Sequence, residues 1–312
     1  MLANLLSRKP FFVEIILGIT FLSLFSLNIY QNYLFSEHLL NIIPFVLLIL
    51  AGFIFFKTSK ITKQSGFALF YYLGWMMVFS SLFLDIKICI AFLINTLMFW
   101  RMVHAEEHAS SKKYSFDIGF CLGVSTFIYP PSILMLGLIL VNYLYLQSLN
   151  LRILALFILG LIFPTILGVQ ILFLTDQMHW LVEFQSFFYR DFWSSNTIFI
   201  LIPILILILI SWFDHVSHAS TQDINKRHIY FLFFLYFINW STIIAIFGGE
   251  NVNLLAILGF PISVFLGRFT QYQTSKIWKE IFLWIYLLTI LGFYFRFEIG
   301  EFYQELLGNV RF

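Results

Sequence analysis

The sequence predicts an all-α fold, a polytopic bundle of transmembrane helices, from its composition, its long apolar runs and its charge pattern. Of the 312 residues, 61% are hydrophobic and only 11% are charged, whereas a soluble domain carries about 25% charged residues. Aromatic residues make up 21% of the chain. Several apolar runs reach the roughly 20 residues that a helix needs to cross the hydrocarbon core of a bilayer. We therefore expect a single integral membrane domain over residues 1–312.

Eleven apolar segments make up the predicted bundle, as nine full spans and one hairpin. They are helices rather than barrel strands, because the runs are continuous and backbone groups in lipid must be paired within their own segment. The hairpin, 115–147, is broken at Pro130 and Pro131 and is either two crossings or a re-entrant pair. Gly119 and Gly123 form a G-x-x-x-G pattern that lets another helix approach closely. The segments are 11–30, 38–56, 66–84, 88–103, 115–129, 131–147, 152–174, 195–213, 229–247, 252–267 and 278–295.

The loops between these segments predict the orientation of the chain. With the N-terminus in the cytoplasm, fourteen of the eighteen Lys and Arg residues fall in cytoplasmic loops and four on the outer side. The positive-inside rule therefore favours a cytoplasmic N-terminus and, with eleven crossings, an outer C-terminus, in a bacterial inner (cytoplasmic) membrane. The four outer residues are Lys87, Arg190, Arg296 and Arg311.

Four uncharged amides and one carboxylate interrupt the predicted spans. Glu14 is either a functional intramembrane group or a side chain that reaches back to the cytoplasmic interface, since it follows the start of its segment by about 5 Å of helix. The amides predict hydrogen bonds between helices. They are Asn95, Asn142, Gln170 and Asn239.

Histidines in a cytoplasmic loop follow a metal-binding spacing. His104, Glu107 and His108 read H-x-x-E-H, which on a helix places two imidazoles on one face with a carboxylate beside them. No third ligand is fixed by spacing, so a solvated loop without metal is the alternative and the expectation. Nothing else in the sequence specifies a cofactor.

The longest outer loop, 175–194, predicts an amphipathic segment lying in the membrane interface. Its aromatic residues, Trp180 among them, alternate with charges such as Glu183 and Arg190. It is either an aromatic anchor or a lid over a lipid-linked substrate, with Trp180, Glu183 and Arg190 beside the polar head. The tail, 296–312, predicts either a second outer interfacial segment or a tail that docks a partner.

Three stretches carry a family resemblance: NTLMFWRM (95–102), FDIGFCLGVSTFIYPPSILML (116–136) and ILGLIFPTILG (158–168). They resemble the middle of a family of uncharacterised bacterial polytopic membrane proteins. That pattern is in turn remotely similar to the C-superfamily glycosyltransferases, which use polyprenyl-phosphate sugars and carry an acidic catalytic residue in a sizeable first outer loop. The resemblance implies Glu37 as the candidate base, although this chain has only about seven residues in that loop.

These observations leave several function classes open. Without a clear catalytic constellation, we expect a non-catalytic subunit or scaffold of a cell-envelope assembly, with membrane lipid and envelope proteins as partners. The net charge of +2 gives no indication of nucleic-acid binding. The alternatives are a glycosyltransferase-like enzyme at the outer face, with Glu37 as base and Arg190 on a phosphate, a cytoplasmic-face metalloenzyme, and a transporter.

Overall fold

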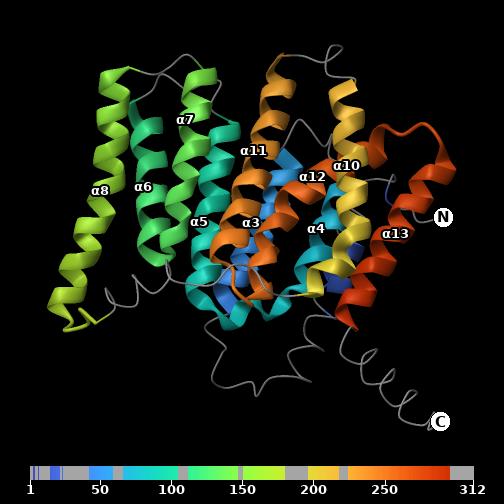
Figure 1. Cartoon of the computed structure of the whole chain (residues 1–312), viewed down its shortest axis with the longest axis horizontal. Coiled ribbons are helices and arrows are strands. Elements are labelled where there is room, and N and C mark those ends of the chain that lie inside the picture. Colours follow the sequence, from blue (N-terminus) through green and yellow to red (C-terminus); the bar gives the residue numbers. More distant parts are fainter. Residues whose placement is uncertain are drawn as a thin grey trace, which may run out of the picture.

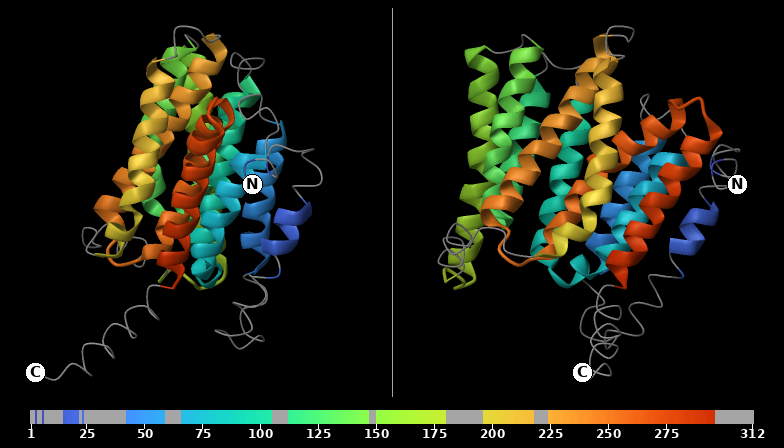
Figure 2. Two further views of the ribbon diagram at one scale, coloured as in Figure 1. Left: turned by 90° about the vertical axis from the view of Figure 1, so that its right-hand side faces the viewer. Right: turned by 45° about the vertical axis from the view of Figure 1, so that its right-hand side comes forward.

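The computed structural model describes residues 42–58, 66–104, 112–146, 150–179, 196–217 and 224–295, with Ala3, Leu6, 15–21 and Ser23. Every element in this part of the chain is helical. The helices pack side by side, with α8 and α13 at opposite edges (Figures 1 and 2). The α-helices are α3 (Ile42–Thr58), α4 (Gly66–Val78), α5 (Ile86–Val103), α6 (Lys112–Ile128), α7 (Met135–Tyr145), α8 (Leu151–Leu174), α10 (Ile202–Ser217), α11 (Ile224–Phe247), α12 (Gly259–Tyr272) and α13 (Lys276–Tyr294). The short 3-10 helices are η2 (Ser80–Leu84), η4 (Pro130–Leu134), η6 (Asn196–Leu201) and η8 (Val252–Leu258).

Six helices in the described residues are long and apolar enough to cross a membrane. They are Ile86–Val103, Leu151–Leu174, Phe199–Ser217, Lys226–Phe247, Val252–Tyr272 and Lys276–Tyr294. Three further apolar helices are shorter, at Ile42–Phe56, Gly66–Val78 and Pro130–Tyr145. The all-helical class is confirmed, and these helices indicate a membrane protein. The count of about eleven segments with nine full spans stays a prediction.

The predicted hairpin consists of α6, η4 and α7. Tyr129 is extended (φ −133°, ψ 93°) because the residue before a proline is kept out of the helical region. The chain therefore reverses at Pro130, and α7 returns beside α6 (Figure 1). Both versions predicted for 115–147 place the two ends of the hairpin at the same end of the bundle, as the structure does.

Several helices continue beyond the apolar runs that predicted them. Segment 195–213 continues as α10 to Ser217, 229–247 begins at Ile224, and 252–267 continues as α12 to Tyr272. An apolar run marks the part of the chain that is buried in lipid, whereas a helix ends where its backbone hydrogen bonds end. Gln273 N–H, for example, still donates to the Phe269 carbonyl at 3.0 Å.

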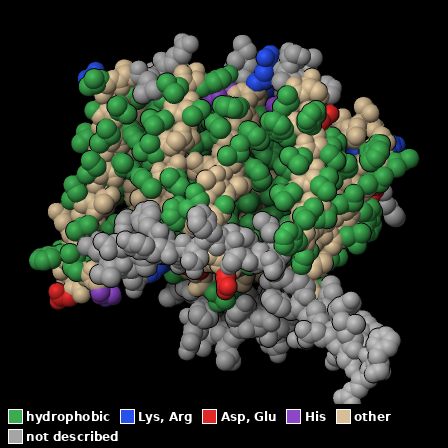
Figure 3. Space-filling view, in the orientation of Figure 1, with side chains coloured by type: hydrophobic (Ala, Val, Ile, Leu, Met, Phe, Trp, Pro, Cys, Tyr) green, Lys and Arg blue, Asp and Glu red, His purple; other side chains and the backbone are tan. Residues whose placement is uncertain are grey.

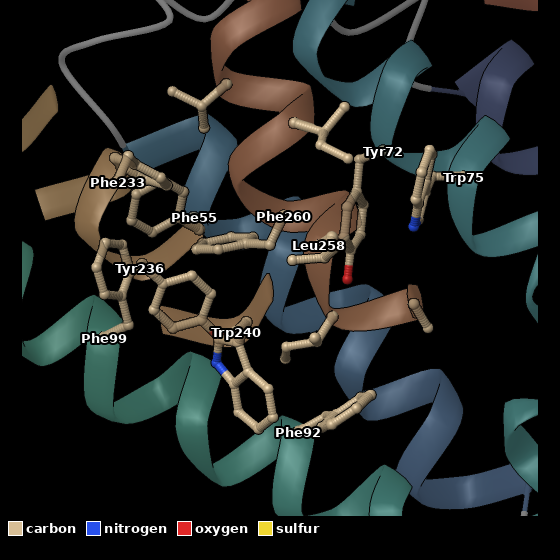
Figure 4. Close-up of a cluster of buried hydrophobic side chains, with 14 of the residues drawn as sticks. Phe55, Tyr72, Trp75, Phe92, Phe99, Phe233, Tyr236, Trp240, Leu258 and Phe260 are labelled. Atoms are coloured by element: carbon tan, nitrogen blue, oxygen red, sulfur yellow. The ribbon is translucent and has the colours of Figure 1, made fainter. Parts of the chain in front are cut away.

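Interlocked aromatic rings fill the centre of the bundle (Figure 4). The Phe260 ring of α12 lies 4.8 Å from the Phe55 ring of α3 and 5.6 Å from the Phe233 ring of α11, between centroids. Phe99 of α5 lies 4.8 Å from Phe233 and 4.4 Å from Tyr236. All five side chains are buried. Four helices thus share one close-packed layer, in which edge-to-face and tilted rings are favourable.

Glycines set the closest helix contact, between α6 and α8. A Cβ at Gly160 would collide with the Phe116 carbonyl, and one at Gly119 would collide with the Phe157 carbonyl. Gly123 meets the next turn of α8 in the same way, at the Leu161 carbonyl. The predicted close approach at this G-x-x-x-G pattern is therefore confirmed. Because the obstructing atoms are backbone, only glycine allows it.

Burial separates central helices from peripheral ones. In the most apolar stretch of the span Val252–Tyr272, which joins η8 and α12, 78% of the residues are buried, against 17% in that of α8. Large apolar side chains cover most of the α8 face turned away from α6. Apolar side chains cover most of the visible flank, and Lys and Arg lie mainly along its upper edge (Figure 3). A surface of this kind requires hydrocarbon as its solvent.

Candidate functional site

Two groups of polar side chains meet the first turns of α11, at the end of the bundle that carries most of the basic residues (Figure 3). His228 and Tyr230 are two residues apart, about 200° around the helix. They therefore face opposite neighbours, and each is buried. His228 lies toward α6 and α7, whereas Tyr230 lies toward α10 and α12.

The first group is a hydrogen-bonded chain of three buried side chains. His228 Nε2 lies 3.1 Å from Asn142 Oδ1, and Asn142 Nδ2 donates to the Tyr114 hydroxyl at 3.0 Å. The Asn142 oxygen can only accept, so the His228 proton sits on Nε2. The Tyr145 ring stacks on the imidazole at 4.1 Å with a 3° tilt. The group ties α6, α7 and α11 together.

The second group is centred on Arg268 of α12. Its Nη1 donates to Nδ1 of His215 on α10, and because arginine cannot accept, that imidazole is neutral. The guanidinium lies 4.5 Å from the Tyr230 ring centroid and 5.7 Å from that of Tyr272. His215 stacks on Tyr230 at 3.6 Å. The positive charge of Arg268 is thus held by neutral groups.

A third polar network lies deeper, between α5, α6 and η4. Asn95 Nδ2 donates to the Ala91 carbonyl at 2.8 Å and to the Ser125 hydroxyl, and Ser125 donates to Ser132 at 3.0 Å. All are buried. Asn95 Oδ1 finds no donor among the described residues. The predicted interhelical role of this amide agrees with these contacts.

Asn239 lies at a groove of about 340 Å³ between α7 and α11. Its Nδ2 donates to the Leu134 carbonyl at 3.0 Å, while its buried Oδ1 has no donor among the residues that the structure describes. Gly137 and Thr242 also line the groove, and its other lining residues are Leu, Ile and Val. A Cβ at Gly137 would meet no atom within 4 Å.

The other predicted site residues do not belong to these polar groups. Gln170 is exposed on α8. His104 ends α5, its ring 6.4 Å from Phe55 and its Nδ1 3.0 Å from the Trp100 carbonyl. No group of three His, Cys, Asp or Glu side chains that could hold a metal occurs in the described ranges. The remaining candidates lie outside the described residues: Glu14, Glu37, Glu107, His108, Trp180, Glu183 and Arg190. So do most of loop 175–194 and all of 296–312.

The sequence pattern does not mark Arg268 as a site residue, because the predicted topology places it among the cytoplasmic loop charges. The available signal was that it follows an apolar run directly and is the only charged residue between 252 and 272. The predicted segments 195–213 and 229–247 likewise leave His215 and His228 outside the helices. Chemically, the described groups donate and accept hydrogen bonds and offer one unneutralised cation.

The family model for DUF6427, a family of unknown function, matches residues 1–303. The chain belongs to this family. No curated protein and no solved structure gives a significant match. Membership of DUF6427 agrees with the predicted resemblance to a family of uncharacterised proteins, whereas the similarity to C-superfamily glycosyltransferases is not among the matches and stays a prediction.

Proposed function

We propose that this DUF6427 member is a non-catalytic subunit of a cell-envelope assembly in the bacterial inner membrane, with its N-terminus cytoplasmic and its C-terminus outside. The observation that carries the proposal is Asn239 in the α7–α11 groove. Its buried carboxamide oxygen has no donor among the described residues. A partner protein with a transmembrane helix would supply that donor once the carboxamide turns its oxygen toward the groove.

Lipid alone is a poor occupant of this groove. An acyl chain offers no hydrogen-bond donor, and an unpaired buried carbonyl costs free energy. A helix with a Ser, Thr, Asn or Gln side chain satisfies the oxygen. The open space at Gly137 lets the partner backbone come close, which is how small residues act in membrane helix pairs.

The packed interior supports a static subunit rather than a transporter. Phe260 and its neighbours close the centre of the bundle between α3, α5, α11 and α12 (Figure 4). Transporters place their substrate near the membrane midplane, between rearranging repeats. Here that space is taken up by aromatic side chains.

A photo-crosslinking experiment in cells tests the proposal. Benzoylphenylalanine at Ile238, which lines the groove and is 43% exposed, should form an adduct with a second protein. The same residue at Leu159 of α8, 58% exposed, is the control for lipid contact. The Ile238 adduct should be lost with Asn239→Leu. If both positions formed adducts with lipid only, the proposal would be refuted. An adduct between two copies of this chain would instead show that the groove joins a homodimer and not an assembly with another protein.

An enzyme acting on a lipid-linked substrate at the outer face is the second candidate function. It is favoured by an apolar groove of about 320 Å³ between α10, α11 and α12, which could hold a prenyl chain. We propose Glu37 as its base and Arg190 as its phosphate contact. Loss of transfer activity on Glu37→Gln would support this function, and an unchanged phenotype would remove it.

A further inference from the structure

We propose that α10, α11 and α12 form a binding site for one anionic phospholipid, with the headgroup phosphate at Arg268 and an acyl chain in the groove below it. The proposal does not depend on the assembly role, because the site lies on other faces of these helices than the α7–α11 groove. It rests on three observations: Arg268 has no counter-ion among the described residues, an apolar groove lies between α10, α11 and α12, and the groove runs along the same three helices as the Arg268 group.

Arg268 lacks a counter-ion in the described part of the chain. Its guanidinium forms no ion pair with another described residue, unlike that of Arg101, which lies 3.4 Å from Asp117. The Arg268 partners are a neutral imidazole and two aromatic rings, and Asp214 acts on it electrostatically only beyond ion-pair distance. A half-buried guanidinium with free N–H donors is well suited to bind a phosphate through paired hydrogen bonds.

The surroundings of Arg268 also favour an anionic headgroup. Lys226 and Arg227, exposed at the start of α11, and Lys276 and Lys279, at the start of α13, lie at the same end of the bundle. The charge pattern of the loops predicts that this end is cytoplasmic. Basic pockets between transmembrane helices at that surface attract anionic lipid headgroups.

The groove lies along the same three helices. Its lining includes Ile208 of α10, Phe237 of α11 and Ile262 of α12. Ile208 precedes His215 by seven residues, and Phe237 follows Tyr230 by seven. Ile262 precedes Arg268 by six. These separations correspond to about 9–11 Å of helix. The groove therefore begins at a depth inside one leaflet, whose hydrocarbon is about 15 Å thick.

An aromatic pair lies between the phosphate position and the groove. Trp212 of α10 stacks on Phe234 of α11, with centroids 4.7 Å apart and a 14° tilt. Aromatic residues of this kind are enriched where the headgroup region meets the hydrocarbon. A phospholipid would thus place its phosphate at Arg268, its glycerol beside Trp212, and a chain against Leu205 and Ala245 in the groove.

Native mass spectrometry of the full chain tests the site. After mild delipidation, the wild-type protein should retain one phosphatidylglycerol in preference to phosphatidylcholine. Arg268→Gln should reduce that retention about tenfold, which corresponds to the loss of one charge-assisted contact. Arg268→Lys should recover part of it. Arg152→Gln removes the same charge from the exposed start of α8, away from these three helices, and should leave retention unchanged.

Two further arms separate the headgroup from the chain. Ala245→Phe fills the groove and should also lower retention, while its elution volume and unfolding temperature without lipid stay those of the wild type. Inorganic phosphate should not displace the lipid. Displacement by phosphate, equal loss with Arg152→Gln, or no preference for phosphatidylglycerol would each overturn the proposal.

Discussion

Buried amides carry more of the polar structure than charges do. Asn142 connects Tyr114 and His228, at 3.0 and 3.1 Å. Asn95 connects to Ser125 and, at 3.3 Å, to Ser132. An amide both donates and accepts, so one residue can satisfy two neighbours without the desolvation cost of an ion. Arg268 is the exception, because its charge is held by an imidazole and two rings.

Replacement of Asn142 by alanine should destabilise the purified protein. Asn142→Ala leaves His228 without its acceptor and removes a partner from Tyr114, at a site where both are buried. We expect a loss of about 1–2 kcal/mol of unfolding free energy, measured by denaturant titration in one detergent. Thr165→Ala, at an exposed hydroxyl that bonds only its own helix, is the control. Equal effects of the two changes would contradict this account.

At the scale of elements, glycine decides which helices touch. Gly119, Gly123 and Gly160 let α6 and α8 meet backbone to backbone. In the same way, Gly267 of α12 would place a Cβ only 2.7 Å from Ala68 Cα of α4. Since lipid solvates every apolar helix face equally well, such close fits select the helix pairs.

The α6–α8 contact gives a sharp test. Gly160→Leu forces the side chain into the Phe116 carbonyl, so the two helices must separate. We expect a loss of about 1–3 kcal/mol, seen as a lower unfolding temperature in nanodiscs. Gly292→Leu, where no atom lies within 4 Å of the added Cβ, should cost little. If both variants melted alike, the glycine contact would not be what joins α6 to α8.

At the scale of the whole molecule, the apolar flank and the basic end define its relation to a bilayer. Six helices of spanning length and large exposed apolar side chains require hydrocarbon around them. The basic residues gathered at one end predict that this end of the bundle faces the cytoplasm. The α11 helix (Ile224–Phe247) connects the two ends, with Lys226 in its first turn and Glu250 in the turn that follows it.

Cysteine labelling of intact cells tests that direction. In a background with Cys89→Ala and Cys121→Ala, a membrane-impermeant maleimide should label Glu250→Cys and spare Lys226→Cys. Both positions are exposed, so burial does not account for the difference. After lysis, both should react. The opposite pattern would reverse the orientation and leave the membrane assignment intact.

The sequence by itself determined that lipid surrounds this protein and where, approximately, its helices lie. The described helices lie close to the predicted segments, because a run of apolar residues in lipid has no alternative to internal backbone pairing. It also pointed to Asn95 and Asn239 as interhelical groups. It misplaced the helix ends around His215, His228 and Arg268, since apolarity does not report where hydrogen bonding stops.

Only the tertiary structure decided which residues meet. His228 and Asn142 are 86 residues apart in sequence, and Arg268 and His215 are 53 apart. A helix that is apolar all round carries no stripe to mark its packed face. Its partners are chosen by the shape of side chains such as Phe260 and Gly160, and that fit becomes visible only when the helices are assembled.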